Sequence, residues 1–169
     1  MILKAIKFID KKHSGQVRKG SGIPYATHPI AASYLLAHYK KSKRLEELIV
    51  ATLLHDTLED TDTSFVEIAT EFTPLVASLV LELTNDPVAI EKMGKLEYQK
   101  KKLVGMSNYG LLIKLVDRLH NISDNPTEKM VNDTIDLITY LNGNRKLTKT
   151  QDRIVLDIVD QCEFVLDRL

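Results

Sequence analysis

The chain has 169 residues, of which 44% are hydrophobic and 27% charged, and its 23 basic residues balance its 23 acidic ones. This length suffices for one domain with a proper core, and the neutral charge balance does not favour a nucleic-acid partner. No run approaches the roughly 18–20 apolar residues of a membrane span, and lysines interrupt the N-terminus too early for a signal-peptide core. The single Cys162 fits a reducing compartment. We therefore predict a cytoplasmic protein with neither a membrane nor a nucleic-acid partner.

Helical periodicity dominates the sequence, and we find no convincing alternation of strand residues. An amphipathic helix is predicted over 2–12, followed by a polar, glycine-bearing loop. The next helix is expected over 29–39, with Pro29 at its first position and His28 at its N-terminus. The most apolar helix is predicted over 45–59.

Capping residues and glycines predict the helices that follow. A long lysine-rich helix is expected over 88–104 despite Gly94. The other predicted helix boundaries are Ser64 with Glu67, Thr73-Pro74, Ser107 or Asn108, Asn125-Pro126 with Glu128 and a closing Gly143, and Thr148 with Gln151. We predict an all-α fold, a single helical bundle over 1–169 with a C-terminal helix over about 149–167.

The most informative segment is 54–61, because a histidine and three acids stand within six residues at the end of an apolar helix. Helical residues four apart share a face, so we expect His55 above Glu59 and Asp56 above Asp60. The alternative to a functional site is that these residues simply lie at a solvent-exposed helix C-terminus. Acids at that position, however, oppose the helix macrodipole. Burying such acids is costly unless water or a cation satisfies them.

Two further residues complete a candidate metal site. His28 lies upstream, and Asp117 lies on a later helix with Lys114 one turn before it to offset its charge. With His55 and Asp56 they offer two imidazoles and two carboxylates, a set that suits a divalent metal with open positions for water. Mixed ligation of this kind fits Mn²⁺, Fe²⁺ or Zn²⁺ better than Mg²⁺, and ligand type alone does not choose among them.

Three motifs then give the chain a family resemblance. They are HSGQVRK leading into SGIPYATHP over 13–29, LLHDTLEDT over 53–61, and IKLVDRLHN over 113–121. In order and spacing they resemble the HD-domain (p)ppGpp hydrolases, the hydrolase half of the Rel/Spo family, and most closely the stand-alone small alarmone hydrolases of the Mesh type. The resemblance covers a motif-bearing core over about 5–142 and implies a single HD domain over 1–169 without the synthetase half.

The resemblance also implies a role for individual positions. The matched ligands, for a metal that is usually Mn²⁺, are His28, His55, Asp56 and Asp117. Glu59 and Asp60 match the acidic pair that orients and activates the attacking water, and Asn121 matches an asparagine beside the leaving or bridging phosphate. The matched substrate-binding residues are Arg18, Lys19, Tyr25 and, in a lysine-rich stretch where most lysines are expected to be solvated, Lys95.

The implied activity is removal of the 3′-pyrophosphate from guanosine tetra- or pentaphosphate, the alarmones of the stringent response, to give GDP or GTP. The chain departs from the family at Ser123, where an arginine is common, and Lys129 or Arg145 is a candidate replacement. One alternative is an HD phosphatase acting on NADPH or another phosphorylated nucleotide. Another is a non-catalytic nucleotide-binding regulator, which the intact Glu59-Asp60 pair argues against. The expected partner is a small-molecule nucleotide, and the oligomeric state is left open.

Overall fold

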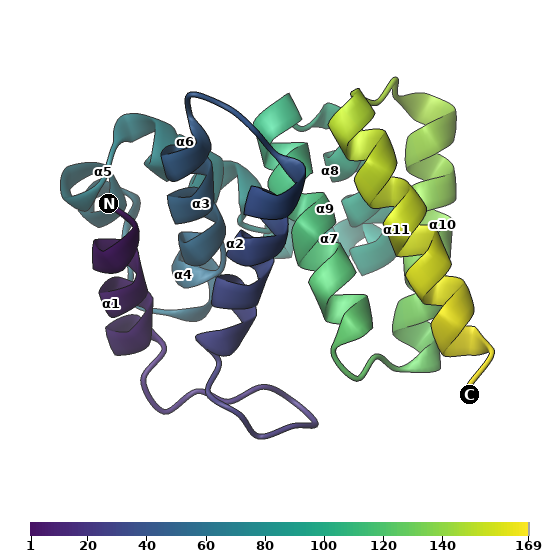
Figure 1. Ribbon diagram of the computed structural model, residues 1–169, viewed down its shortest axis with the longest axis horizontal. Coiled ribbons are helices and arrows are strands. Elements are labelled where there is room, and N and C mark those ends of the chain that lie inside the picture. Colours follow the sequence, from purple (N-terminus) through teal and green to yellow (C-terminus); the bar gives the residue numbers. More distant parts are fainter. Residues whose placement is uncertain (169) are drawn as a thin grey trace. The chain divides into compact units, whose positions relative to one another are not determined.

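The computed structural model describes residues 1–168, and every regular element within them is a helix (Figure 1). The described residues contain one isolated antiparallel bridge, between Val17 and Pro24, and no strand beyond it. The all-α prediction is confirmed. None of the helices in residues 1–168 is both long enough and apolar enough to cross a bilayer. The chain divides into two compact units, Met1–Thr84 and Asn85–Leu169.

The first unit is built around its most apolar helix. Its helices are α1 (Ile2–Lys12), α2 (Thr27–Tyr39), α3 (Leu45–Leu54), α4 (Thr57–Asp60), α5 (Phe65–Glu71) and α6 (Pro74–Leu83). Helix α3 packs against α1, α2 and α6. Its residues from Val50 to Leu54 are all buried, as expected of a helix that neighbours cover on every side. The end of α3 therefore carries the residues that follow it, His55 and Asp56, to the edge of this core.

The second unit is a bundle of longer helices. They are α7 (Pro87–Met93), α8 (Lys95–Gly105), α9 (Asn108–Ser123), α10 (Glu128–Asn144) and α11 (Lys149–Leu166). Helix α9 packs against α10 and α11, and α10 also packs against α8. Most of α9 is buried and apolar, and the buried charged residue on it is Asp117. Cys162 on α11 lies in the core, where burial raises the pKa of its thiol.

Side-chain caps explain most of the helix starts. Ser64, Thr73, Ser107 and Thr148 each accept a hydrogen bond from the backbone N–H at the third helical position, as their sequence context predicts. For α10 the cap is Thr127 rather than the Asn125-Pro126 pair, and Gly143 lies inside the last turn instead of closing the helix. Helix α2 begins at Thr27, two residues before its predicted start.

Two predicted helices are broken, and these predictions are wrong. The helix expected over 45–59 stops at Leu54 and restarts at Thr57. Thr57 Oγ1 donates to the carbonyl of Leu54 at 2.7 Å, and His55 Nδ1 lies 2.7 Å from the carbonyl of Thr52. These side chains take carbonyls that a continuous helix would use. His55 and Glu59 consequently do not share one helix, although Asp60 N still donates to the Asp56 carbonyl at 2.9 Å.

The helix expected over 88–104 is interrupted at Gly94. This glycine has a φ of +83°, in the left-handed region that favours glycine, so α7 ends there and α8 begins at Lys95. Asp86 caps α7, since its side chain accepts from Val88 N and Ala89 N. The lysine-rich stretch therefore forms two helices, α7 and α8.

The capping box at the start of α11 offers a direct test of this local chemistry. Thr148 accepts from Gln151 N at 3.3 Å, and Gln151 Oε1 accepts from Thr148 N at 2.9 Å. Thr148→Ala is expected to destabilise the protein by about 1 kcal/mol and to lower its melting temperature by about 2–4 °C. Thr148→Ser keeps the hydroxyl and serves as the matched control in thermal unfolding. Equal melting temperatures for the two variants would show that the cap adds nothing.

Candidate functional site

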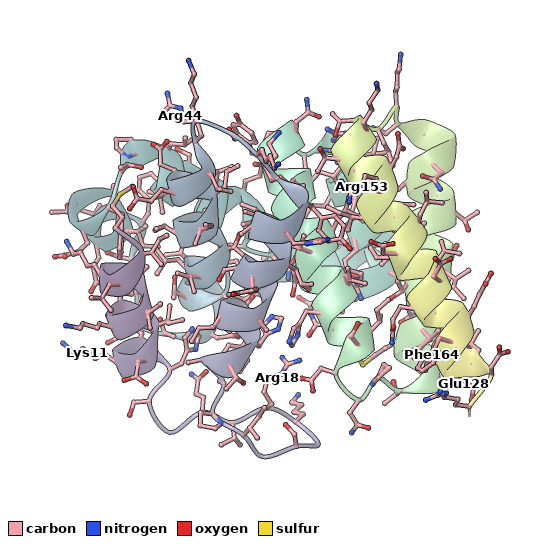
Figure 2. All side chains as sticks on the ribbon, viewed as in Figure 1. Lys11, Arg18, Arg44, Glu128, Arg153 and Phe164 are labelled. Atoms are coloured by element: carbon pink, nitrogen blue, oxygen red, sulfur yellow. The ribbon has the colours of Figure 1, made fainter. Side chains whose placement is uncertain are left out.

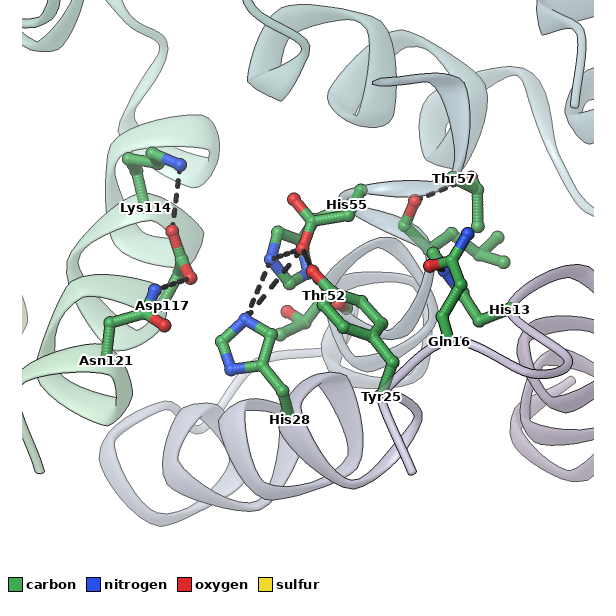
Figure 3. A network of polar contacts seen from close by, with 12 residues as sticks. His13, Gln16, Tyr25, His28, Thr52, His55, Thr57, Lys114, Asp117 and Asn121 are labelled. Carbon is green, nitrogen blue, oxygen red and sulfur yellow. Dashed lines mark hydrogen bonds and ion pairs between the residues drawn. The ribbon is translucent and has the colours of Figure 1, made fainter. Parts of the chain in front are cut away.

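Three of the predicted ligands converge in the first unit (Figure 3). His28 comes from the first turn of α2, while His55 and Asp56 lie in the break between α3 and α4. His28 Nε2 and His55 Nε2 are 3.3 Å apart. Asp56 Oδ2 lies 3.0 Å from His55 Nε2 and 3.9 Å from His28 Nε2. One ligand atom from each residue thus falls within 4.8 Å of the other two.

The donor atoms of this cluster fit a divalent metal ion. The Thr52 carbonyl can only accept a hydrogen bond, so the His55 Nδ1 at 2.7 Å from it carries the proton. In the neutral imidazole this leaves the lone pair of His55 Nε2 facing His28 and Asp56. The residues His28 and His55 are 1% and 2% exposed. Electron-rich atoms that converge in a buried place repel one another, and a cation bound between them would offset this repulsion. Two imidazoles with a carboxylate suit Mn²⁺, Fe²⁺ or Zn²⁺.

Two acids follow the cluster on the short helix α4. Glu59 and Asp60 are both exposed as residues. Even so, partial burial of its carboxyl group raises the pKa of Asp60, and repulsion from Asp56 and from Glu59 raises it further. Glu59 and Asp60 thus lie on the helix that directly follows Asp56, whose carboxylate is close enough to affect the pKa of Asp60.

The loop between α1 and α2 brings Arg18, Lys19 and Tyr25 to this unit. Arg18 N donates to the carbonyl of Ile23 at 2.8 Å, and Gly22 N donates back to the carbonyl of Arg18 at 3.0 Å, so the loop closes on itself. The Arg18 guanidinium lies over the ring of Tyr25, 5.9 Å from its centroid, and Figure 2 shows Arg18 on this loop. Lys19 is exposed.

Tyr25 makes a contact that the sequence did not predict. Its hydroxyl donates a hydrogen bond to Asp56 Oδ2, the same oxygen that faces the two histidines. The family resemblance implies only a substrate contact for Tyr25. A tyrosine beside a metal-ligand motif is the only sequence signal of this contact, and spacing along the chain cannot reveal it because 31 positions separate the two residues.

Asp117 lies on α9 of the second unit and is held by its own helix (Figure 3). It is 5% exposed. Lys114 Nζ donates to Asp117 Oδ2 at 2.8 Å, and Asn121 Nδ2 donates to Asp117 Oδ1 at 2.7 Å. The predicted charge offset by Lys114 is confirmed. The histidine cluster belongs to the other unit, so the place of Asp117 among the metal ligands stays a prediction.

A pocket within the second unit was missed by sequence reasoning. Its polar lining consists of Lys102, Lys114 and Arg118 together with the amides of Asn85 and Gln99. The apolar lining is Leu103, Leu115, Leu137 and Ile138. Arg118 donates to Gln99 Oε1 at 3.1 Å. The four-residue spacing of Lys114 and Arg118 is the signal that places both on one face of α9.

Several basic residues considered from the sequence have other positions. Lys95 is exposed at the start of α8 and does not line that pocket. Arg145 donates through Nη1 to the carbonyls of Leu103, Val104 and Met106, where it closes the end of α8. The exposed Lys129 pairs with Asp133 at 2.6 Å. Arg145 therefore has a structural role, whatever else it contacts.

Comparison with known proteins decides the family. Residues 5–146, which run through both units, match the family model described as the HD domain. The chain belongs to the HD-domain family. Within this family it is related to the MESH1-type ppGpp hydrolases and to the hydrolase domains of SpoT and Rel proteins.

Sequence relatives come from animals and bacteria. The HD-domain chain is 36% identical over 125 residues to guanosine-3′,5′-bis(diphosphate) 3′-pyrophosphohydrolase MESH1 of Danio rerio. The aligned residues cover 73% of this chain and 68% of that protein. It is 36% identical over 126 residues to the Homo sapiens protein of the same name, with the same two coverages of 73% and 68%. A 3′-pyrophosphohydrolase of Aquifex aeolicus is 38% identical over 133 residues, but these are only 17% of that longer protein.

Solved structures share the fold of this HD-domain chain. The structure of a metazoan orthologue of SpoT that hydrolyses ppGpp matches with a TM-score of 0.78 at 28% identity, covering 95% of this chain and 94% of that one. A Listeria monocytogenes protein matches with a TM-score of 0.66 at 16% identity, covering 90% of this chain and 99% of that one, and shares the fold alone.

Proposed function

We propose that this protein is a metal-dependent 3′-pyrophosphohydrolase of guanosine tetra- and pentaphosphate. The observation that carries the proposal is the convergence of His28, His55 and Asp56 in the first unit, followed by the acids of α4. Relatives that are 36% identical carry the name of this activity. In the reaction, a water oxygen bonds to the phosphorus attached to the 3′ oxygen. The bond between that phosphorus and the 3′ oxygen breaks, and the 3′ oxygen gains a proton.

The proposed metal is Mn²⁺, held by His28, His55, Asp56 and the Asp117 of the second unit. When bound, the metal supplies a Lewis acid that neutralises phosphate charge and makes a water molecule easier to deprotonate. Because Lys114 and Asn121 hold both oxygens of Asp117, this carboxylate is oriented before any ligand arrives.

The two acids of α4 are proposed to orient and deprotonate the attacking water. We assign Glu59 as the base that takes the proton of the attacking water, and Asp60 as the residue that orients this water. Both are exposed, so a substrate and water can reach them. Asn121 is proposed to contact the phosphate, exchanging its present hydrogen bond to Asp117 for one to the substrate.

Cations for a polyphosphate come from both units. Arg18 and Lys19 are proposed to hold the substrate in the first unit, because a guanidinium can bind phosphate through two parallel hydrogen bonds. In the second unit the exposed Lys95 is proposed as a weaker phosphate contact. Tyr25, whose ring lies under the Arg18 guanidinium, is proposed to contact the same substrate.

Two other functions remain to be separated from this one. The donor set and acids described above would serve equally for a phosphatase acting on NADPH or another phosphorylated nucleotide. A non-catalytic nucleotide-binding regulator is the alternative of another class, and the presence of both Glu59 and Asp60 beside the cluster speaks against it.

Product analysis distinguishes these functions. The protein is incubated with Mn²⁺ and ppGpp, with NADPH in a parallel reaction, and the products are separated by ion-exchange chromatography. We expect GDP and pyrophosphate from ppGpp, and no product once a chelator removes the metal. Phosphate released from NADPH alone would move the assignment to the second function. Metal and nucleotide binding without turnover of either substrate would favour the regulator.

A further inference from the structure

We propose that Tyr25 is a positioning residue for the metal ligand Asp56, and that His13 and Gln16 hold Tyr25 in place. The proposal rests on the proposed metal site, and it gives the tyrosine a role beyond substrate contact. Its starting observation is the hydrogen bond from the Tyr25 hydroxyl to Asp56 Oδ2. All four residues belong to the first unit.

Asp56 receives an orienting contact from outside its own helix. It is the N-cap residue of α4, a position where an aspartate normally accepts a backbone N–H, yet its side chain makes no such capping bond. Its side chain is 20% exposed, compared with 1% for the side chains of the two histidines it faces. The Tyr25 hydroxyl therefore contacts this partly solvated carboxylate from outside α4 and restricts its rotation.

The oxygen that Tyr25 holds is the one that matters for a metal. Asp56 Oδ2 is the atom 3.0 Å from His55 Nε2. A carboxylate oxygen has more than one lone pair, so it can accept from the phenol and still coordinate a cation. Such outer partners orient a ligand before the metal arrives and reduce the entropy that coordination would otherwise cost.

Tyr25 is itself fixed on two sides. Its ring packs against the ring of His13, with centroids 4.7 Å apart, and meets the edge of the His28 ring at 5.9 Å. Its backbone N–H donates to the Gln16 carbonyl at 2.9 Å, and His28 N donates to the Tyr25 carbonyl at 3.0 Å. The tyrosine is thus tied both to the loop before it and to the first metal ligand after it.

His13 and Gln16 extend this support to α4. Gln16 Nε2 donates to the carbonyl of Asp60 at 2.9 Å, which fixes the amide so that Oε1 faces His13. Because Oε1 can only accept, His13 Nδ1, at 2.8 Å, carries the proton. His13 is 4% exposed and so provides a rigid surface for the Tyr25 ring. The buried histidine of the first motif is explained by this packing.

The test is Tyr25→Phe, because phenylalanine keeps the ring against His13 and removes only the hydroxyl. Tyr34→Phe is the matched control, since Tyr34 is 82% exposed on α2. Mn²⁺ affinity is measured by calorimetry on metal-stripped protein, and the visible spectrum of the Co²⁺-loaded protein reports ligand geometry. We expect Tyr25→Phe to bind Mn²⁺ about tenfold more weakly and to change the Co²⁺ spectrum, with wild-type values for Tyr34→Phe.

A second variant separates positioning from general stability. Gln16→Ala removes the hydrogen bond between His13 Nδ1 and Gln16 Oε1 but leaves the Tyr25 hydroxyl in place. We therefore expect a smaller loss of Mn²⁺ affinity than in Tyr25→Phe. The melting temperature of metal-free Tyr25→Phe is expected to match that of metal-free wild type. A lower melting temperature with unchanged Mn²⁺ affinity would overturn the proposal in favour of a purely structural tyrosine.

Failure of this proposal differs from failure of the metal site. If His55→Ala loses Mn²⁺ while Tyr25→Phe keeps wild-type affinity and an unchanged Co²⁺ spectrum, only the positioning role is refuted. A raised KM with unchanged metal affinity in Tyr25→Phe would likewise reject it and leave Tyr25 as a substrate contact. If His55→Ala itself keeps its Mn²⁺, the metal site is wrong and the proposal falls with it.

Discussion

Replacing Glu59 by glutamine is expected to lower turnover of ppGpp by about 100-fold to 10,000-fold, the range that general acid–base catalysis contributes. Glutamine has the shape of glutamate but cannot take a proton from the attacking water. Because Glu59 lies on α4 and outside the group of converging ligand atoms, bound Mn²⁺ is expected to stay near the wild-type amount. Steady-state kinetics and metal analysis of the same preparation measure the two effects.

The matched control for this variant is Glu91→Gln, an exposed acid on α7. It removes the same charge from the surface, so its turnover is expected to equal that of wild type. Full activity of Glu59→Gln would reject Glu59 as the base and leave Asp60 as the acid to test. Loss of metal together with activity would instead make Glu59 a residue that holds the metal.

Replacing His55 by alanine is expected to remove both the metal and the activity. His55 Nε2 lies 3.3 Å from His28 Nε2 and 3.0 Å from Asp56 Oδ2, so it contributes the atom common to both close contacts of the cluster. Without His55 the proposed site loses one of its two imidazoles and keeps only His28 with the carboxylates of Asp56 and Asp117, which weakens metal binding. Metal analysis after extensive dialysis and the ppGpp assay report the two losses.

His38→Ala is the control for this variant, since His38 is exposed at the end of α2 and a histidine there gives no ligand to the cluster. It is expected to keep wild-type metal content. Wild-type occupancy in His55→Ala would rule out His55 as a ligand. A drop in melting temperature is also expected for His55→Ala, because His55 Nδ1 donates to the Thr52 carbonyl at the end of α3.

Residues close together in the chain were predicted best. The caps at Ser64 and Thr148 were predicted because a glutamate or glutamine stands three positions after each. The cap at Thr73 was predicted because a proline follows it directly. The pairing of Lys114 with Asp117 was found because residues three apart on a helix are neighbours. Local geometry and sequence spacing coincide in these cases.

The breaks at Gly94 and at His55-Asp56 were missed although they are local. Hydrophobic periodicity continues through both, so the pattern predicts one helix where there are two. At Gly94 a positive φ interrupts the helix. At His55 the side chains of His55 and Thr57 compete for backbone carbonyls, and periodicity does not record this competition.

The amino-acid sequence by itself determined the helical class, most helix starts and the residue types of the metal motif, because each depends on propensity, capping or a short spacing. Only the tertiary structure decided which ligand atoms meet. His28 and His55 stand 27 positions apart, and the packing of α2 on α3 brings their Nε2 atoms together. The same packing turns Tyr25 towards Asp56. Contacts between distant segments depend on how helices pack as three-dimensional bodies, and no periodicity within one helix contains that information.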